Sequence, residues 1–223
     1  MNKILYFLVF ILLLGCGYNQ KEKFHSSSHK SRYEKLLSIY KEISIDTLKV
    51  YSPEDLIGEY KGVEIDSSEV MLFPKEIVEQ HFVDPPGLFA IYKFEIDINT
   101  IGLITRTPSE YAPSSIKLFF LDKTKDLIIG YVELAESLGD AGDYMITDSW
   151  IFKDNDKRLM ALVCVMERHD NSVDDEKDTS TQEWNYYYLL NLSKEHIDTI
   201  SKDEKVLIMK FGNLIKKNVR SPR

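Results

Sequence analysis

Seven runs of residues with strand-forming character follow one another between residues 88 and 192, and this series most limits the folds that the chain can adopt. Each run is rich in β-branched and aromatic residues and ends at a short polar segment that favours a turn. Strands in series with short connections predict an antiparallel meander, either folded into a sandwich or closed as a barrel, so the expected class is mainly β, of the α+β type. The runs are Leu88–Ile98, Ile101–Thr107, Ile116–Leu121, Leu127–Leu134, Tyr144–Phe152, Leu159–Met166 and Trp184–Leu192.

Two of the strand predictions carry more detail. Leu159–Met166 is apolar at every position, so we expect it to be buried on both faces, near the middle of the sheet. Cys164 lies inside this run and is expected to pack as a small hydrophobic side chain. Ahead of the series, Val63–Ile65 and Val70–Phe73 are predicted to pair as a hairpin across the polar residues between them.

Short helices are predicted before the strand series. Ser31–Glu34 fits a capping box, and the apolar residues behind it recur at the spacing of one helix face up to about Ile43. Ser52–Asp55 is a second helical start, with proline at the first helical position. Pro74–Phe82 is a third short candidate, because a pair of prolines ends it.

A longer helix is predicted after the strand series. Ser201–Glu204 again fits a capping box, and apolar residues then repeat at helical spacing into a lysine-rich end, where the positive charges suit the helix dipole. The alternative for part of this segment is a strand over Val206–Met209.

The first sixteen residues have the form of an export signal. Lys3 precedes an uncharged, largely apolar stretch, Ile4–Leu14, which is too short to cross a hydrocarbon core that requires about 20 apolar residues. Leu13-Leu14-Gly15-Cys16 resembles the lipobox of bacterial lipoproteins. This resemblance implies cleavage before Cys16 and lipid on its sulfur, whose acyl chains would anchor the chain to a membrane. It also implies a place in the bacterial cell envelope, at the outer membrane or the cell surface in a Gram-negative organism.

The sequence therefore divides into three predicted parts. Residues 1–15 form the signal peptide, residues 16–30 the lipidated cysteine with a polar, flexible tether, and residues 31–223 a single globular, mostly-β domain. The formal net charge of −8 argues against binding to nucleic acid, because the phosphates would repel an acidic protein.

Four carboxylates crowd a glycine-containing segment that is predicted to be a loop between two strands. Loops that offer several carboxylate oxygens suit calcium, so this segment is a candidate ion site, although it lacks the ligand order of an EF-hand. Two of the carboxylates could instead serve glycoside hydrolysis, which requires carboxyl groups about 5–9.5 Å apart. The third interpretation is an acidic turn exposed to solvent. The four residues are Glu133, Glu136, Asp140 and Asp143.

Two further features are candidates for contact with a ligand or partner. Trp150 and Trp184 are expected to supply aromatic contacts, close in sequence to several tyrosines. Alternation along Tyr186–Tyr188 places the middle tyrosine on the opposite face from the other two, so part of this run is expected in the core. The acidic segment Asp170–Gln182 is predicted to be either a solvated loop or a partner-binding surface.

The sequence contains none of the motifs HExxH, GxSxG, GxxxxGK[ST] or GxGxxG. The function that we expect is therefore a membrane-anchored binding module for a protein or glycan partner, without a cofactor unless calcium binds. The alternative is a carboxylate-dependent hydrolase that acts on glycans of the cell envelope, so catalytic activity stays open.

Overall fold

The computed structural model describes residues 30–52, 58–81, 87–109, 115–193 and 197–216. Residues 31–223 pack as one unit. Within the described ranges, no helix is long and apolar enough to cross a membrane. The leader, the tether up to residue 29 and most of the second predicted helix start, at residues 53–55, lie outside the described residues.

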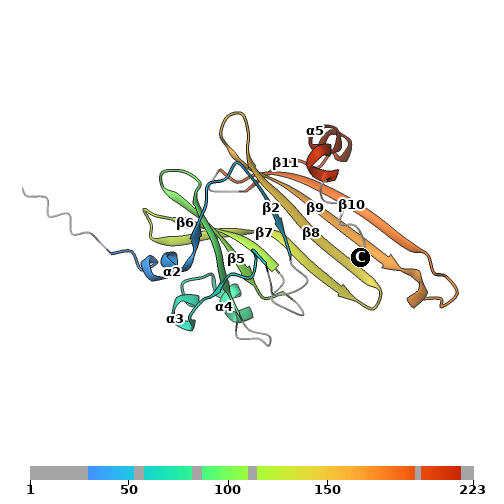
Figure 1. Cartoon of the computed structure of the whole chain (residues 1–223), viewed down its shortest axis with the longest axis horizontal. Helices are drawn as coiled ribbons and strands as arrows, with labels where there is room; N and C mark the ends of the chain where they lie inside the picture. The colour runs from blue at the N-terminus through green and yellow to red at the C-terminus, as the bar shows by residue number, and fades with distance from the viewer. Residues whose placement is uncertain (1–29, 53–57, 82–86, 110–114, 194–196, 217–223) are drawn as a thin grey trace, which may run out of the picture. The chain divides into compact units, whose positions relative to one another are not determined.

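Eleven strands of the described chain form one mixed sheet (Figure 1). Its main path runs β1-β4-β5-β6-β7-β8-β9-β10-β11, with β3 on β4 and β2 on β8. From β4 to β11, every strand is antiparallel to the next strand in the chain, which confirms the predicted meander. The strands are β1 (Lys41–Glu42), β2 (Thr47–Tyr51), β3 (Val63–Glu64), β4 (Phe89–Glu95), β5 (Thr100–Thr107), β6 (Ser115–Asp122), β7 (Leu127–Asp140), β8 (Asp143–Lys153), β9 (Leu159–Asp170), β10 (Thr181–Asn191) and β11 (Asp198–Ser201).

Strand β7 changes its partner partway along its length. Its first part, up to Ala135, pairs with β6, and its second part, from Glu136 to Asp140, pairs with β8. We call β1, β3–β6 and the first part of β7 the first half-sheet, and β2, β8–β11 and the second part of β7 the second half-sheet. The path of paired strands is open from β1 to β11, so the described sheet is not closed into a barrel.

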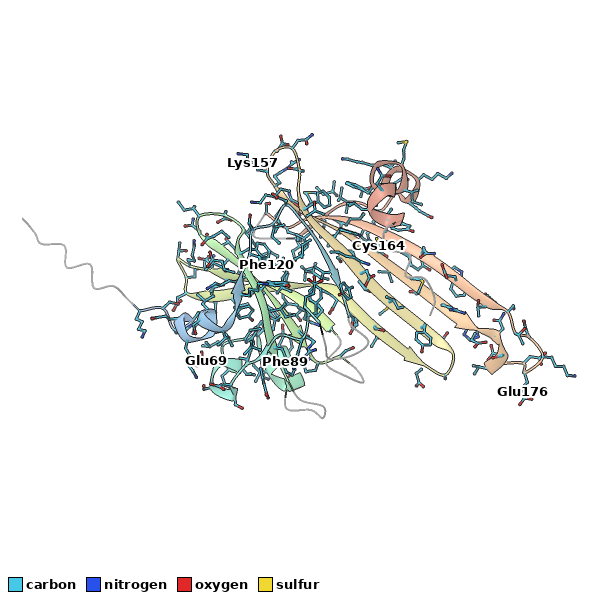
Figure 2. The ribbon with its side chains drawn as sticks, in the orientation of Figure 1. Glu69, Phe89, Phe120, Lys157, Cys164 and Glu176 are labelled. Carbon is cyan, nitrogen blue, oxygen red and sulfur yellow. The ribbon has the colours of Figure 1, made fainter. Side chains whose placement is uncertain are left out.

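The main hydrophobic core joins residues of both half-sheets. Ile104, Leu118 and Phe120 of the first half-sheet pack in one cluster with Ile151 and Ala161 of the second. Phe120 is labelled near the middle of this packed region in Figure 2. Two sheet faces that share a core in this way form the sandwich type of packing. The inner face of each half-sheet is the face that lies on this core.

Helices cover the outer faces. The three short helices α2 (Glu34–Ile39), α3 (Ser67–Val70) and α4 (Lys75–His81) pack on the outer face of the first half-sheet, where Leu36, Val70 and Ile77 share a buried cluster with Phe119. The C-terminal helix α5 (Glu204–Lys216) packs on the outer face of the second half-sheet through Leu207, which contacts a cluster containing Trp150, Leu162 and Leu189. The helix predicted from Pro74 corresponds to α4. The C-terminal helix is also present, but it starts at Glu204, because Ser201 belongs to β11 and Asp203, not Ser201, accepts from the amide of Val206.

The hairpin predicted between Val63–Ile65 and Val70–Phe73 is wrong. Ser67–Val70 is the helical turn α3, and β3 pairs with β4 instead, with Val63 opposite Ala90. The backbone carbonyl of Asp66 accepts from the amides of Glu69 and Val70, as at a helix start. The turn continues beyond α3, since the amide of Phe73 donates to the carbonyl of Val70, and both side chains are buried.

The first helix is shorter than predicted, because α2 ends at Ile39 rather than near Ile43. Beyond it, the hydroxyl of Tyr40 is hydrogen-bonded to that of Thr105 at 2.6 Å, and Lys41–Glu42 pairs with β4. These tertiary contacts override the continued helical spacing of apolar residues. Ser31 also departs from the predicted capping box, because its hydroxyl donates to Asp126 and accepts from the amide of Tyr33.

Strand β9 lies between β8 and β10, as its continuous apolar run predicted. Leu159–Val163 is buried at every position, whereas Cys164–Met166 is only half-buried because the core ends there. Cys164 is half-buried and packs against the cluster under α5, at the margin of the core in which it was expected.

Candidate functional site

The segment predicted to be an acidic loop is a tight hairpin. Strand β7 continues to Asp140, β8 starts at Asp143, and only Ala141 and Gly142 form the turn. Both turn residues have positive φ, 48° and 89°. This is the backbone of a type I′ turn, whose twist matches that of paired strands. The connection is therefore shorter than the predicted loop, and Gly142 serves the backbone of a hairpin turn, as the interpretation of an exposed acidic turn expects.

The outer ends of β7–β10 extend past the main core as an arm (Figure 1). We define the arm as Glu136–Ile146, Val165–Asp170 and Thr181–Tyr186, with the connection at 171–180. Every side chain of the three strand segments is half-buried or exposed, in contrast to the buried middle of the sheet. Glu176 is labelled at the outer end of the arm in Figure 2.

A row of four residues crosses the inner face of the arm. Leu138, Met145, Glu167 and Trp184 lie opposite one another on consecutive strands, so their side chains share one face. They border a hollow of about 500 Å³, which we call the tip groove. Trp184 is 44% exposed, although it is one of the largest apolar side chains. The groove is lined by Leu138, Gly139, Asp140, Ala141, Asp143, Tyr144, Met145, Glu167, Arg168 and Trp184.

The surroundings of the tip groove are strongly acidic. Apart from His169, the arm contains two basic residues, Arg168 and Lys177. Outside the strands, the acidic connection predicted at 170–182 contains a short 3-10 turn at Asn171–Val173, and residues 174–180 are exposed. The acidic side chains of the arm are Glu136, Asp140, Asp143, Glu167, Asp170, Asp174, Asp175, Glu176, Asp178 and Glu183.

His169 ties the acidic connection to the hairpin. Its Nδ1 lies 2.7 Å from Asp143 Oδ1, and its Nε2 lies 3.0 Å from Asp174 Oδ2. The hydrogen bonds to Asp143 and then Asp174 raise the pKa of His169 above its ordinary value, because both favour the imidazolium. The sequence alone gave no sign of this contact, since Asp143 and His169 are 26 residues apart.

Glu133 lies away from the tip, in a buried polar cluster on the outer face of the first half-sheet. Its carboxylate is 2.5 Å from Lys117 Nζ and accepts from the Ser115 hydroxyl at 2.6 Å. Lys117 is 7% exposed and Ser115 is fully buried. Burial raises the pKa of Glu133, and the ammonium of Lys117 opposes that shift. This arrangement satisfies a buried lysine and is a structural ion pair.

The four predicted carboxylates form two pairs along β7 and its turn. Glu136 accepts from the Ser109 hydroxyl at 2.6 Å, near Glu133, whereas Asp140 lies opposite Asp143 at the hairpin end. Four residues of extended strand, about 13 Å, separate Glu136 from Asp140. Among the described residues, no group of three or more His, Cys, Asp or Glu side chains is placed to hold a metal ion. Only the Asp140–Asp143 pair belongs to the tip groove.

The two tryptophans do not meet. Trp150 lies opposite Leu162, and Trp184 lies opposite Glu167 on the same strand, β9. Five residues along a strand amount to about 17 Å, and an odd separation places the two rings on opposite faces. Trp150 is 8% exposed and packs under α5. Of the two tryptophans, Trp184 is the accessible one.

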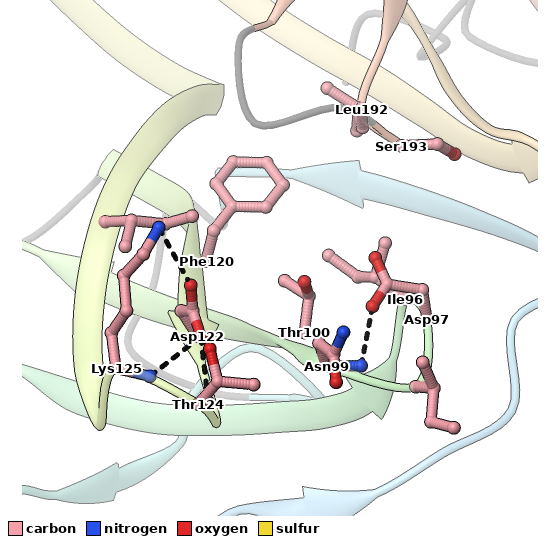
Figure 3. Close-up of a pocket in the computed structure, with 12 residues that line it drawn as sticks. Ile96, Asp97, Asn99, Thr100, Phe120, Asp122, Thr124, Lys125, Leu192 and Ser193 are labelled. Atoms are coloured by element: carbon pink, nitrogen blue, oxygen red, sulfur yellow. Dashed lines mark hydrogen bonds and ion pairs between the residues drawn. The ribbon is translucent and has the colours of Figure 1, made fainter.

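A second hollow, of about 390 Å³, lies at the other end of the main core (Figure 3). Its floor includes Phe120 and Leu192, and its rim includes Asp122, Thr124 and Lys125. Asp122 accepts from the Thr124 hydroxyl at 2.6 Å and from the amides of Thr124 and Lys125, and these bonds lower its pKa. This turn was not predicted from the sequence, although aspartate two residues before threonine is a common turn signal. The polar groups of this turn are hydrogen-bonded to one another.

No family model matches this chain, and no curated protein or solved structure matches it.

Proposed function

We propose that this chain is a lipoprotein of the bacterial cell envelope, anchored by lipid on Cys16, and that its tip groove binds a basic protein partner. The observation that carries the binding proposal is the exposed ring of Trp184 in a groove with acidic surroundings. The leader and the lipobox-like Leu13–Cys16 support the anchor.

The apolar lining of the tip groove is suited to a protein partner. Tryptophan and methionine are enriched where protein interfaces bind most strongly, and the groove presents Trp184 and Met145 on one face. Trp184 is 44% exposed, so its ring is available to a partner at this groove.

The charge of the arm selects among partners. Ten carboxylates against Arg168 and Lys177 make the surface negative, so a basic partner is attracted and an acidic one is repelled. Carboxylates around an apolar centre resemble the polar rim of a protein interface. Such charges increase the association rate and the specificity of binding. A tether of residues 16–30 would allow the domain to move about 20 Å from the membrane.

The proposal is tested with the full chain and a pair of peptides. One peptide contains tryptophan and several lysines, and the other is the same peptide with citrulline in place of each lysine. We expect the cationic peptide to bind more tightly, and Trp184→Ala to weaken binding about 30-fold or more, which corresponds to about 2 kcal/mol. Asp140→Asn with Asp143→Asn should weaken binding and reduce its dependence on salt.

The matched control is Glu42→Gln with Glu64→Gln, which removes two exposed carboxylates from the first half-sheet. This variant should bind the cationic peptide as the unchanged chain does. Equal binding of both peptides, or unchanged binding by the tip variants, would contradict a basic partner at this groove.

A glycan is the other ligand that the sequence predicts, because an exposed tryptophan can also stack on a sugar ring. Soluble peptidoglycan fragments that bind with dependence on Trp184 but not on Asp140 and Asp143 would favour that ligand. The hydrolase alternative stays a prediction. Turnover of a glycoside or ester that is lost in Asp140→Asn would support it.

A further inference from the structure

Arg106 is a buried cation without a counter-charge. It is 1% exposed and is the largest of the fully buried side chains in the described structure. Its Nε and Nη1 atoms are buried and have no hydrogen-bond partner among the described residues. Burial alone lowers the pKa of its guanidinium, and no carboxylate in the described part of the chain opposes that effect. A guanidinium in this state destabilises the fold unless an acceptor is supplied.

Other shielded cations in the described chain do have carboxylate partners. Lys117 lies 2.5 Å from Glu133, and Lys49 lies 3.7 Å from Asp148. The chain is rich in acidic residues, with 36 Asp and Glu against 28 Lys and Arg. The structure therefore neutralises its other shielded positive charges and leaves Arg106 without such a partner.

The guanidinium is also held in place. Its carbon lies 4.1 Å from the centre of the Phe89 ring, which is opposite Arg106 on the neighbouring strand. Gly87 lies against the same ring, because a Cβ atom there would come within 2.6 Å of it, and the residue has φ of 138°. Phe89 is labelled in Figure 2 on the first half-sheet. A fixed guanidinium loses little freedom when it binds an acceptor.

The neighbours of Arg106 indicate the kind of ligand. Arg106 lies opposite Ile116, and Ile104 precedes it on the same face of β5; both isoleucines are fully buried in the main core. Arg106 is the penultimate residue of β5, so its position is at the end of this apolar face. One positive charge among apolar side chains matches a ligand with one negative charge and an apolar body.

We propose that Arg106 binds the carboxylate of a ligand with an apolar body, at the end of the inner face of β5. The carboxylate accepts a hydrogen bond from an unpartnered guanidinium nitrogen, and the apolar body lies against the adjacent core. This site is separate from the tip groove, whose lining does not include Arg106.

The test uses the full chain and octanoate as the probe, with 1-octanol and inorganic phosphate as comparisons. We expect calorimetric titration to show octanoate binding at one site, and a rise in melting temperature with octanoate. Neither effect should occur with 1-octanol or with phosphate at equal concentration. Octanoate and 1-octanol acting alike, phosphate binding through Arg106 in place of octanoate, or no octanoate binding would each overturn the proposal.

Arg106→Met removes the charge and keeps the length of the side chain. It should weaken octanoate binding about tenfold or more, because a charge-assisted hydrogen bond is lost. The same variant should have a higher melting temperature without ligand, since an unpaired buried charge is gone. Arg158→Met is the matched control: Arg158 is exposed and ion-paired with Asp154, and its loss should leave octanoate binding unchanged.

Arg106→Lys settles the question if the methionine variant does not fold. Lysine keeps the charge but lacks the planar donor geometry, so the variant should fold and bind octanoate more weakly. Binding by Arg106→Lys or Arg106→Met that equals that of the unchanged chain would overturn the proposal.

Discussion

His169 and Asp143 lie 2.7 Å apart across the paired ends of β9 and β8, and the same imidazole lies 3.0 Å from Asp174. One side chain thus fixes the acidic connection to the hairpin that borders the tip groove. The three residues form a clamp that depends on the charge of the imidazole.

The clamp should weaken as pH rises. Its hydrogen bonds to Asp143 and Asp174 raise the pKa of His169 above the unfolded value of about 6.5. The stabilisation is therefore complete below that unfolded value and is lost as pH rises through the folded one. We expect amides of residues 141–143 and 171–175 to exchange faster with solvent above the raised pKa, after correction for the intrinsic pH dependence. His169→Gln should remove this change, and equal pH dependence in both proteins would contradict it.

Breaking the Lys117–Glu133 pair should destabilise the fold. Glu133→Gln leaves the buried Lys117 ammonium without its counter-charge, which typically costs about 3 kcal/mol of the free energy of unfolding. Urea denaturation of both proteins measures this loss of free energy of unfolding. The control is Glu95→Gln, whose partner Lys123 is more exposed, and the expected loss there is below about 1 kcal/mol. Lys117→Met combined with Glu133→Leu should recover most of the loss.

Calcium should leave the melting temperature unchanged up to millimolar concentration. The tip offers Asp140 and Asp143, and Asp143 already binds His169, whereas calcium takes six to eight oxygen ligands. A rise in melting temperature with calcium that is lost in Asp140→Asn would restore the ion site predicted from the sequence.

Replacement of Cys16 tests the anchor. Cys16→Ala should leave the chain unlipidated, so the protein should leave the membrane fraction and lose the mass of the acyl chains. Mass spectrometry of the native protein measures the modification directly. An intact Met1 and an unmodified thiol in the native protein would contradict the lipoprotein proposal.

The strands were predictable where the sequence pattern alone decides burial. The apolar run Leu159–Met166 indicated a central strand that is buried on both faces. The strand is central, and its residues are buried as far as Val163 and half-buried from Cys164 to Met166. The change of partner in β7 was not predictable, because the residues around Ala135 carry no local signal for it. At Ser67–Val70, a short helical start overrode a strand pattern of only a few residues.

The candidate site was predicted in part. Asp140, Asp143 and Trp184 line one groove, but Glu133, Glu136 and Trp150 lie elsewhere, because strand extension and alternation separate them. The unusual position of Arg106 could have been predicted by the same reasoning. It shares a strand face with Ile104, and a charged residue on a buried face is a functional signal that alternation can reveal.

The shared strand β7 has a mechanical consequence. Since one continuous backbone supplies a pairing edge to each half-sheet, neither half can melt without removing a neighbour from the other. Heating should therefore give a single cooperative transition, and a force applied to the arm should be carried into the first half-sheet along the backbone of β7.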